Sequence, residues 1–271
     1  MAPRLVAVDM DGTFLDPDGR VPAGFAELYP RLTAAGAVFT PASGRQLRTL
    51  ADMFSELGEQ MSYIAENGAV VVHHGEVTST TPMPAGPVHA VIDAVADFNA
   101  ATAGTGHAPL WLLVCRPEVA YLTDPEAAGD PEVVKYYHSV EVTADLHAAA
   151  DAGDVVKLAV FTPEDAETVV APALRPAAGG MNVVVSGAHW IDVMSPEADK
   201  GRALRELAGY LGCPREETVA FGDYLNDYEL LRAAGTAYAM ANAHPRLKEI
   251  ADHIAPSNAE HGVLTVLESL L

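Results

Sequence analysis

The chain has 271 residues, of which 49% are hydrophobic and 20% are charged, and its formal net charge is −21. A chain of this length and composition folds into one large or two smaller globular domains and is not disordered. The excess of acidic side chains argues against nucleic acid or membrane as a partner, because both need a basic surface. An anionic substrate would need a local cation in its site, either a metal ion or a well-placed Lys or Arg.

The sequence contains no predicted membrane span and no signal-peptide pattern. No apolar stretch approaches the roughly 18 residues that a span needs, and the opening MAPRLVAV has neither a long apolar region nor a small-residue cleavage site. Cys115 and Cys213 lack the close spacing of a metal or redox motif. These features predict a cytoplasmic protein with two buried thiols.

The first 80 residues alternate short strand patterns with helical patterns. The predicted elements are strands at 5–8, 37–40 and 61–65, helices at 24–36 and 45–58, and a hairpin at 69–80. The strand–helix–strand order is typical of a parallel sheet with helices on its faces. The hairpin turn is predicted at His74 and Gly75.

The pattern changes after residue 80. Residues 80–87 hold three prolines in eight positions and are predicted to be a linker. The elements predicted beyond it are helices at 88–100 and 164–175 and strands at 109–115, 119–123, 155–161 and 182–186. We interpret residues 83–187 as an inserted domain.

The alternation returns in the last third of the chain. The predicted elements there are helices at 200–212, 228–235, 244–251 and 261–271 and strands at 218–221 and 237–240. The predicted fold class is α/β: a Rossmann-like parallel-sheet core with helices on both faces, built from residues 1–82 and 188–271. Residues 83–187 are the inserted α+β cap domain.

Four polar clusters follow predicted strands. They are DMDGT at 9–13, PASGR at 41–45, ENG at 66–68 and GDYLND at 222–227. Ligands of open parallel sheets bind outside the carboxyl ends of the strands. We therefore expect the four clusters to line one crevice.

Asp9 and Asp11 follow the first strand directly. Taken alone, D-x-D-G fits a turn or a helix N-cap equally well. Two close carboxylates at the end of a buried strand also suit Mg²⁺, which prefers oxygen ligands, and Asp223 and Asp227 are candidates for the same set. One carboxylate is a candidate nucleophile and the other a candidate general acid or base.

Three further polar positions point to an anionic ligand. Ser43 and Gly44 offer a hydroxyl and a backbone N–H for phosphoryl oxygens, although an ordinary strand-to-helix turn with a Ser cap fits as well. Lys200 begins a predicted helix, where a cation is unfavourable with respect to the helix dipole. The alternative for Lys200 is a solvated surface side chain. His73 and His74 are assigned to the hairpin turn and not to a metal.

These motifs resemble those of the haloacid dehalogenase superfamily, specifically its Cof-like (type IIB) phosphatases. The four signatures of that family stand here as Asp9-Met10-Asp11-Gly12-Thr13, Ser43-Gly44-Arg45, Lys200-Gly201 and Gly222-Asp223-Tyr224-Leu225-Asn226-Asp227. ENGA at 66–69 and SNAEHGV at 257–263 also match the subfamily. The resemblance is specific in the core and weak in the insert.

The resemblance implies a role for each matched residue. Asp9 attacks phosphorus and forms an aspartyl-phosphate, and Asp11 protonates the leaving alcohol and then activates water. Mg²⁺ is held by the Asp9 side chain, the Asp11 carbonyl and Asp223. The remaining implied roles are phosphoryl binding by Ser43 and Gly44, charge screening by Lys200, placement of the phosphate or metal shell by Asn226 and Asp227, and substrate contact by Arg45 and Asn67.

The sequence thus predicts a cytoplasmic, Mg²⁺-dependent phosphatase, a phosphoric monoester hydrolase acting on a small phosphorylated metabolite such as a sugar phosphate. One alternative is a phosphotransferase or phosphomutase on the same fold. A dehalogenase is disfavoured because Asp11 has no task in that reaction and no Mg²⁺ is needed. A non-catalytic phosphate-binding module would lack a catalytic residue, whereas Asp9, Asp11, Lys200 and Asp223 are all present.

Overall fold

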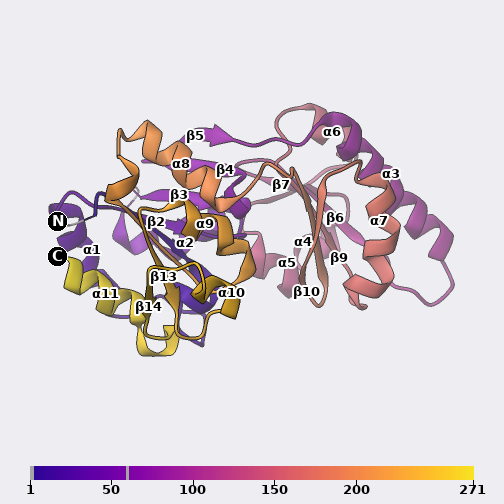
Figure 1. Ribbon diagram of the computed structural model, residues 1–271. Helices are drawn as coiled ribbons and strands as arrows, with labels where there is room; N and C mark the ends of the chain where they lie inside the picture. Colours follow the sequence, from indigo (N-terminus) through magenta and orange to yellow (C-terminus); the bar gives the residue numbers. More distant parts are fainter. Residues whose placement is uncertain (1–2, 59–60) are drawn as a thin grey trace. The chain divides into compact units, whose positions relative to one another are not determined.

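The computed structural model describes residues 3–58 and 61–271 (Figure 1). The chain divides into two compact units, one formed by Met1–Ser79 with Ala198–Leu271 and the other by Thr80–Glu197. The inserted domain was expected at 83–187, so the second unit begins three residues earlier and ends ten residues later.

The first unit is built on an eight-stranded sheet in the order β14-β13-β12-β1-β2-β3-β4-β5. Its strands are β1 (Leu5–Asp9), β2 (Val38–Ala42), β3 (Ser62–Ala65), β4 (Val70–His73), β5 (Glu76–Thr80), β12 (Thr218–Gly222), β13 (Thr236–Met240) and β14 (His253–Ala255). The run from β14 to β3 is parallel, and β4 is antiparallel to β3. The residues that follow β1, β2, β3 and β12 therefore leave the sheet at one edge.

Helices pack against this sheet in two groups. They are α1 (Phe25–Ala34), α2 (Leu47–Met53), α8 (Lys200–Tyr210), α9 (Tyr228–Ala233), α10 (Pro245–Lys248) and α11 (Gly262–Leu270). α8 and α9 pack together, as do α1 and α11. The predicted α/β class with a largely parallel sheet is confirmed.

The predicted hairpin is present, and β4 and β5 are joined by His74 and Gly75. Both turn residues have positive φ, 50° for His74 and 81° for Gly75. A two-residue turn of this kind matches the twist of the strands it joins. The His73 and His74 rings stack with their centres 3.8 Å apart, in keeping with a structural role in the turn.

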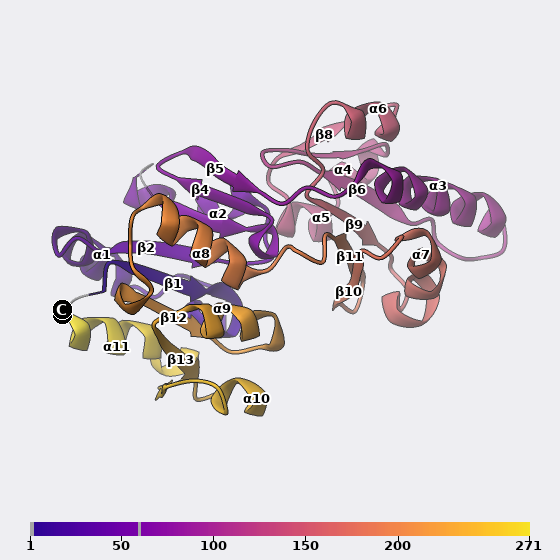
Figure 2. The ribbon, with the colours of Figure 1, turned by 45° about the horizontal axis from the view of Figure 1, so that its top comes forward.

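The second unit has a six-stranded sheet in the order β10-β11-β9-β6-β7-β8 (Figure 2). Its strands are β6 (Trp111–Cys115), β7 (Ala120–Leu122), β8 (Val140–Val142), β9 (Lys157–Phe161), β10 (Asn182–Gly187) and β11 (Trp190–Met194). Its helices are α3 (Ala85–Thr102), α4 (Pro125–Ala128), α5 (Pro131–Tyr136), α6 (Leu146–Asp151) and α7 (Ala171–Ala177). α3 packs on α6 and α7, and apolar side chains of these helices and of the central strands form the core.

Two sequence-based expectations for the second unit need correction. The predicted linker at 80–87 includes the first turn of α3, which begins at Ala85 directly after Pro84. The fully buried strand β11 was not predicted, because Asp192 interrupts its apolar run. Asp192 is buried beside Lys157 of the neighbouring strand β9, with their charged atoms 3.9 Å apart.

The helix lengths and the two cysteines bear on the sequence-based expectations about membranes and thiols. Among the described residues, no helix has the length and apolar content required to cross a bilayer. Cys115 and Cys213 are both free thiols, and both are buried as expected.

Candidate active site

The first motif begins where β1 ends. Asp9 is the last residue of that strand, and Gly12 follows with φ of +83°. A Cβ atom on Gly12 would collide with the carboxylate of Asp223, so only glycine permits this close approach. Phe14 is buried against Phe25 and Phe39, which holds the end of the motif in the core.

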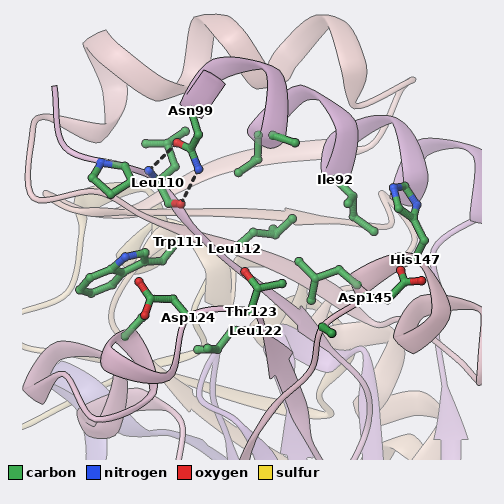
Figure 3. A pocket seen from close by; sticks show the side chains of 16 residues that line it. Ile92, Asn99, Leu110, Trp111, Leu112, Leu122, Thr123, Asp124, Asp145 and His147 are labelled. Atoms are coloured by element: carbon green, nitrogen blue, oxygen red, sulfur yellow. Dashed lines mark hydrogen bonds between the residues drawn. The ribbon is translucent and has the colours of Figure 1, made fainter. Parts of the chain in front are cut away.

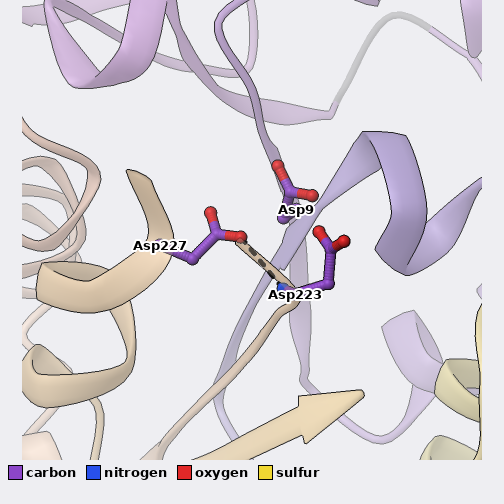
Figure 4. A group of neighbouring side chains, drawn as sticks. All are labelled: Asp9, Asp223 and Asp227. Atoms are coloured by element: carbon purple, nitrogen blue, oxygen red, sulfur yellow. Dashed lines mark hydrogen bonds between the residues drawn. The ribbon is translucent and has the colours of Figure 1, made fainter. Parts of the chain in front are cut away.

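Three carboxylates lie side by side at the ends of β1 and β12 (Figure 4). Asp9, Asp223 and Asp227 each offer one oxygen, and these oxygens all lie within 4.8 Å of one another. The Asp223 backbone N–H donates to Asp227 Oδ2 at 3.0 Å, and the Thr13 hydroxyl donates to Asp223 Oδ1 at 3.2 Å. The first and fourth sequence motifs are therefore joined directly.

Lys200 supplies a cation within this cluster. Its Nζ lies 2.5 Å from Asp9 Oδ1 and 2.7 Å from Asp227 Oδ1, and its side chain is only 1% exposed. The surface-lysine alternative is thus wrong. Asp199 caps α8 by accepting from the Arg202 backbone N–H at 2.7 Å, and this cap fixes where the helix and Lys200 begin.

Burial and mutual repulsion shift the pKa values of these groups. Burial, followed by the charge of Asp227, raises the pKa of Asp9 well above its usual value, although Lys200 acts in the opposite direction. Burial and Asp227 likewise raise the pKa of Asp223 to about 6. Burial opposes the charged form of Lys200, but Asp227 and Asp9 outweigh it and raise its pKa, so Lys200 stays protonated.

The charge of the cluster has a simple consequence. Three ionised carboxylates with one ammonium leave an excess of two negative charges, which a divalent cation would offset. Carboxylate oxygens are also the ligands that hard cations prefer. The cluster therefore fits a divalent metal ion in both charge and ligand chemistry.

Asp11 has a different partner from Asp9. Its carboxylate oxygens accept from Arg45, with Nε 3.0 Å from Oδ2 and Nη2 2.6 Å from Oδ1. The Asp11 side chain is 58% exposed, whereas that of Asp9 is 8% exposed. The two carboxylates of the first motif thus occupy distinct environments, one accessible and paired with Arg45 and one buried beside Lys200.

The loops after β2, β3 and β12 also meet. Ser43 is buried, its hydroxyl accepts from the Arg45 N–H at 3.2 Å, and its carbonyl accepts from the Asn67 N–H at 2.9 Å. A Cβ on Gly44 would press on the Asn67 amide. That amide accepts in turn from Asn226 Nδ2 at 3.5 Å. The predicted site residues therefore gather at one edge of the sheet.

The sequence analysis assigned no role to three polar residues of this edge, although Thr13 and Asn258 stand in motifs quoted there. Thr13 was quoted in the first motif but given no task, although it holds Asp223. Asn242 donates to the Gly12 carbonyl at 2.7 Å, and Asn258 donates to the Leu15 carbonyl at 2.9 Å. Asn242 follows β13 at the same carboxyl edge, so the rule applied to the other four strands would have found it.

A family model described as haloacid dehalogenase-like hydrolase matches residues 6–267. The chain belongs to this family. Among its curated relatives, 5-amino-6-(5-phospho-D-ribitylamino)uracil phosphatase YbjI of Escherichia coli is 31% identical and aligns over 100% of this chain and 97% of its own length. HMP-PP phosphatase of Serratia proteamaculans is 28% identical over 91% of this chain and 87% of its own length.

Solved structures show the same fold. A protein of Eubacterium rectale is 27% identical, with a TM-score of 0.83 over 99% of both chains. A sugar phosphatase assigned by its name to subclass IIB of the family has a TM-score of 0.76 at 20% identity, over 99% of this chain and 100% of its own. The family and enzyme class predicted from the sequence, a hydrolase of phosphoric monoesters, agree with these matches.

Proposed function

We propose that the protein is a Mg²⁺-dependent phosphatase that hydrolyses a small phosphorylated metabolite through an aspartyl-phosphate on Asp9. The observation that carries this proposal is the position of Lys200, buried between Asp9 and Asp227 and beside Asp223. A buried ammonium among several carboxylates is suited to a site where a phosphoryl group and a divalent cation bind together.

The metal site follows from which oxygens are free to bind. Asp227 Oδ1 accepts from Lys200, and its Oδ2 accepts from the backbone N–H groups of Asp223 and Tyr224. We therefore assign Mg²⁺ to the side chains of Asp9 and Asp223 and to the Asp11 carbonyl. Asp227 then orients Lys200 and the Asp223 loop. When bound, Mg²⁺ offsets the negative charge of the transferring phosphoryl group.

The two carboxylates of the first motif divide the chemistry. An Asp9 oxygen attacks phosphorus while the bond to the leaving oxygen breaks, and the leaving oxygen takes a proton from Asp11. Asp11, now a carboxylate, accepts a proton from water, and the water oxygen displaces Asp9 from phosphorus. The greater exposure of Asp11 suits a group that must reach the leaving group and then a water molecule.

The remaining site residues bind the phosphate and the substrate. The Ser43 hydroxyl and the Gly44 N–H are assigned to phosphoryl oxygens, with Asn226 on the opposite loop. Arg45 and Asn67 lie next to them and are assigned to the rest of the substrate. Phosphoryl transfer depends chiefly on such positioning and on charge stabilisation.

The names of the relatives guide the choice of substrates. Two of them are named for phosphorylated intermediates, a phosphoribitylamino-uracil and HMP-PP. We propose that the substrate of this chain is likewise a small phosphorylated metabolite, and sugar phosphates belong in the first panel of compounds.

Phosphate release from such a panel, with and without Mg²⁺, tests the proposal. Turnover by the wild type should require Mg²⁺ and fall at least about a thousandfold in Asp9→Asn, which keeps the shape of the side chain but loses the nucleophile. Asp18→Asn, an exposed position, is the matched control and should keep full activity. Binding without turnover would contradict a phosphatase, and phosphate found on an added acceptor alcohol would identify a phosphotransferase.

A further inference from the structure

Two histidines and two aspartates connect α3 and α6 in the second unit. His89 Nδ1 lies 2.7 Å from His147 Nδ1, His89 Nε2 lies 2.9 Å from Asp151 Oδ1, and His147 Nε2 lies 3.1 Å from Asp93 Oδ1. Each helix contributes a His and, four residues later, an Asp. The four side chains thus form a chain of three hydrogen bonds that crosses between the helices.

The two imidazole rings meet edge to edge. Their planes differ by 20° and their centres are 4.9 Å apart. That separation equals the 2.7 Å between the two Nδ1 atoms plus about one ring radius on each side. The two Nδ1 atoms therefore face each other end on, which is the geometry of a linear N–H···N hydrogen bond.

The three contacts need one more proton than neutral histidines provide. Each contact joins a nitrogen to a nitrogen or to a carboxylate oxygen, and each requires one proton. Two neutral imidazoles supply two N–H groups. If both Nε2 atoms donate to Asp93 and Asp151, two lone pairs oppose each other at 2.7 Å; if one Nδ1 donates instead, one carboxylate faces a lone pair.

We propose that His89 and His147 share one extra proton, and that this proton joins α3 to α6 as a pH-dependent clamp. Loss of the proton at higher pH leaves either two opposed lone pairs or a carboxylate that faces a lone pair, so one of the three hydrogen bonds is lost. Gain of a second proton at lower pH places two N–H groups against each other. The clamp is therefore strongest at intermediate pH, where the pair holds one extra proton, and weakens on both sides.

The surroundings of the pair favour a positive charge on it. The carboxylates of Asp93 and Asp151 flank it, and both are about two-thirds exposed. Other ionisable side chains on α3, α6 and the elements packed against them are Asp97 on α3, Arg175 on α7, Tyr121 on β7 and Cys115 on β6, together with Asp145, which caps α6. The two carboxylates thus stabilise positive charge on the pair, and the contact between the two Nδ1 atoms limits that charge to one extra proton.

A metal ion does not fit this geometry. Histidine nitrogens bind Zn²⁺ at roughly 2.0–2.1 Å, so two Nδ1 atoms opposed end on would be about 4 Å apart across a metal ion. The observed 2.7 Å is the distance of a hydrogen bond.

The clamp borders a cavity of about 390 Å³ in the second unit (Figure 3). His147 and Leu146 of α6 line it together with Ile92 and Val95 of α3 and Trp111 of β6. Separation of α3 from α6 would widen this cavity. The shared proton would thereby limit the size of this cavity.

NMR of the intact protein labelled with ¹⁵N in its histidine rings tests the proposal directly. At about pH 6.5 we expect one low-field proton and a scalar coupling across the hydrogen bond between the two Nδ1 nuclei. Both signals should disappear in His89→Gln and in His147→Gln and persist in His107→Gln. His107 is an exposed histidine that pairs with Glu164 and lies outside the chain of contacts.

Hydrogen exchange of α6 amides, corrected for the intrinsic pH effect, provides an independent measurement. In the wild type, protection should be greatest near pH 6.5 and fall several-fold toward about pH 5 and pH 8.5. In His147→Gln this maximum should vanish. A wild type without the Nδ1–Nδ1 coupling at any of these pH values would overturn the proposal, as would a coupling that zinc chelation abolishes.

Discussion

Arg45 contacts both carboxylate oxygens of Asp11, with Nε 3.0 Å from one and Nη2 2.6 Å from the other. Because the Asp11 side chain is 58% exposed, this ion pair adds at most about 1 kcal/mol to stability. Its two-point geometry does fix the direction in which the carboxylate faces. Under the proposed mechanism, this contact would affect catalysis more than folding.

Replacement of Arg45 by Lys should therefore reduce kcat with little change in stability. Lys keeps the charge but cannot bind both oxygens at once, so we expect kcat to fall about tenfold and the free energy of unfolding to change by less than about 0.5 kcal/mol. Steady-state kinetics and urea unfolding measure the two quantities. Arg48→Lys, an exposed Arg–Asp pair in α2, is the control, and an unchanged kcat in Arg45→Lys would remove Arg45 from the catalytic apparatus.

Lys200→Met should destabilise the metal-free protein strongly at neutral pH. The substitution leaves Asp9 and Asp227 buried without their cation, which costs about 3–5 kcal/mol. Burial and repulsion already raise the pKa of Asp9 in the folded state, so a carboxylate of this kind is tolerated better when protonated. The loss of stability caused by Lys200→Met should therefore become smaller as the pH falls.

Urea unfolding of Lys200→Met at about pH 7.5 and pH 5 measures this effect. Lys248→Met is the control, because its exposed Nζ makes a single hydrogen bond to the Ala241 carbonyl and its loss should cost about 1 kcal/mol at either pH. An equal deficit for Lys200→Met at both pH values would mean that the buried carboxylates do not cause it.

Metal binding should weaken below about pH 6. The pKa of Asp223 is raised to about 6 in the folded protein, so protons compete with the metal for this carboxylate below that pH. Calorimetric titration with Mg²⁺ between about pH 5 and pH 8 should show an affinity that rises with pH. The residual affinity of Asp223→Asn should vary less with pH over this range, and a wild-type affinity independent of pH would contradict the assignment of Asp223.

The raised pKa of Asp223 has the opposite consequence for the metal-free protein, whose stability should increase as the pH falls. The folded state holds a proton on Asp223 with a pKa near 6, whereas the ordinary value is 3.8. The folded state therefore binds more protons between these two values, and the contribution of Asp223 to stability grows as the pH falls through this window. Saturating Mg²⁺ should cancel this gain in stability, because the ion binds the deprotonated carboxylate. Thermal unfolding with and without Mg²⁺, at about pH 5 and pH 7.5, measures the difference.

Gly12→Ala should impair metal binding more than its effect on the backbone predicts. Gly12 has φ of +83°, and a Cβ there meets the Asp223 carboxylate. Gly19→Ala is a matched control, since Gly19 has φ of +75° and open space around its Cβ position. Both variants should lose about 1 kcal/mol of stability. Only Gly12→Ala should also lose about tenfold or more in Mg²⁺ affinity. Equal Mg²⁺ affinities of the two variants would show that the Asp223 loop moves to accommodate the Cβ atom without a loss of binding.

The convergence of the four motifs was predictable because the carboxyl ends of parallel strands share one edge. The contacts that hold the loops together were harder to predict from the sequence. Asn242 donates to the Gly12 carbonyl across a separation of 230 positions in the sequence, so only the folded chain shows this partner. The pairing of Lys200 with Asp227 joins residues 27 positions apart and depends on the packing of α8 against α9.

The second unit was harder to predict because its elements are short. α4 and α5 have four and six residues and lack the periodicity that identifies a helix. Their beginnings nevertheless carry a signal, since Asp124 and Asp130 cap them and a proline follows each. Strand β11 was missed for a different reason, because its buried Asp192 is acceptable only beside Lys157 of β9.

Lys200 lies only two residues beyond Ala198, where the chain re-enters the first unit. Its position depends on a local device, the Asp199 cap of α8, and on the close packing of Gly68 and Gly201 against neighbouring backbone. The position of Lys200 therefore does not depend on the length or sequence of residues 80–197. Evolution can therefore remodel or exchange the insert without moving this lysine.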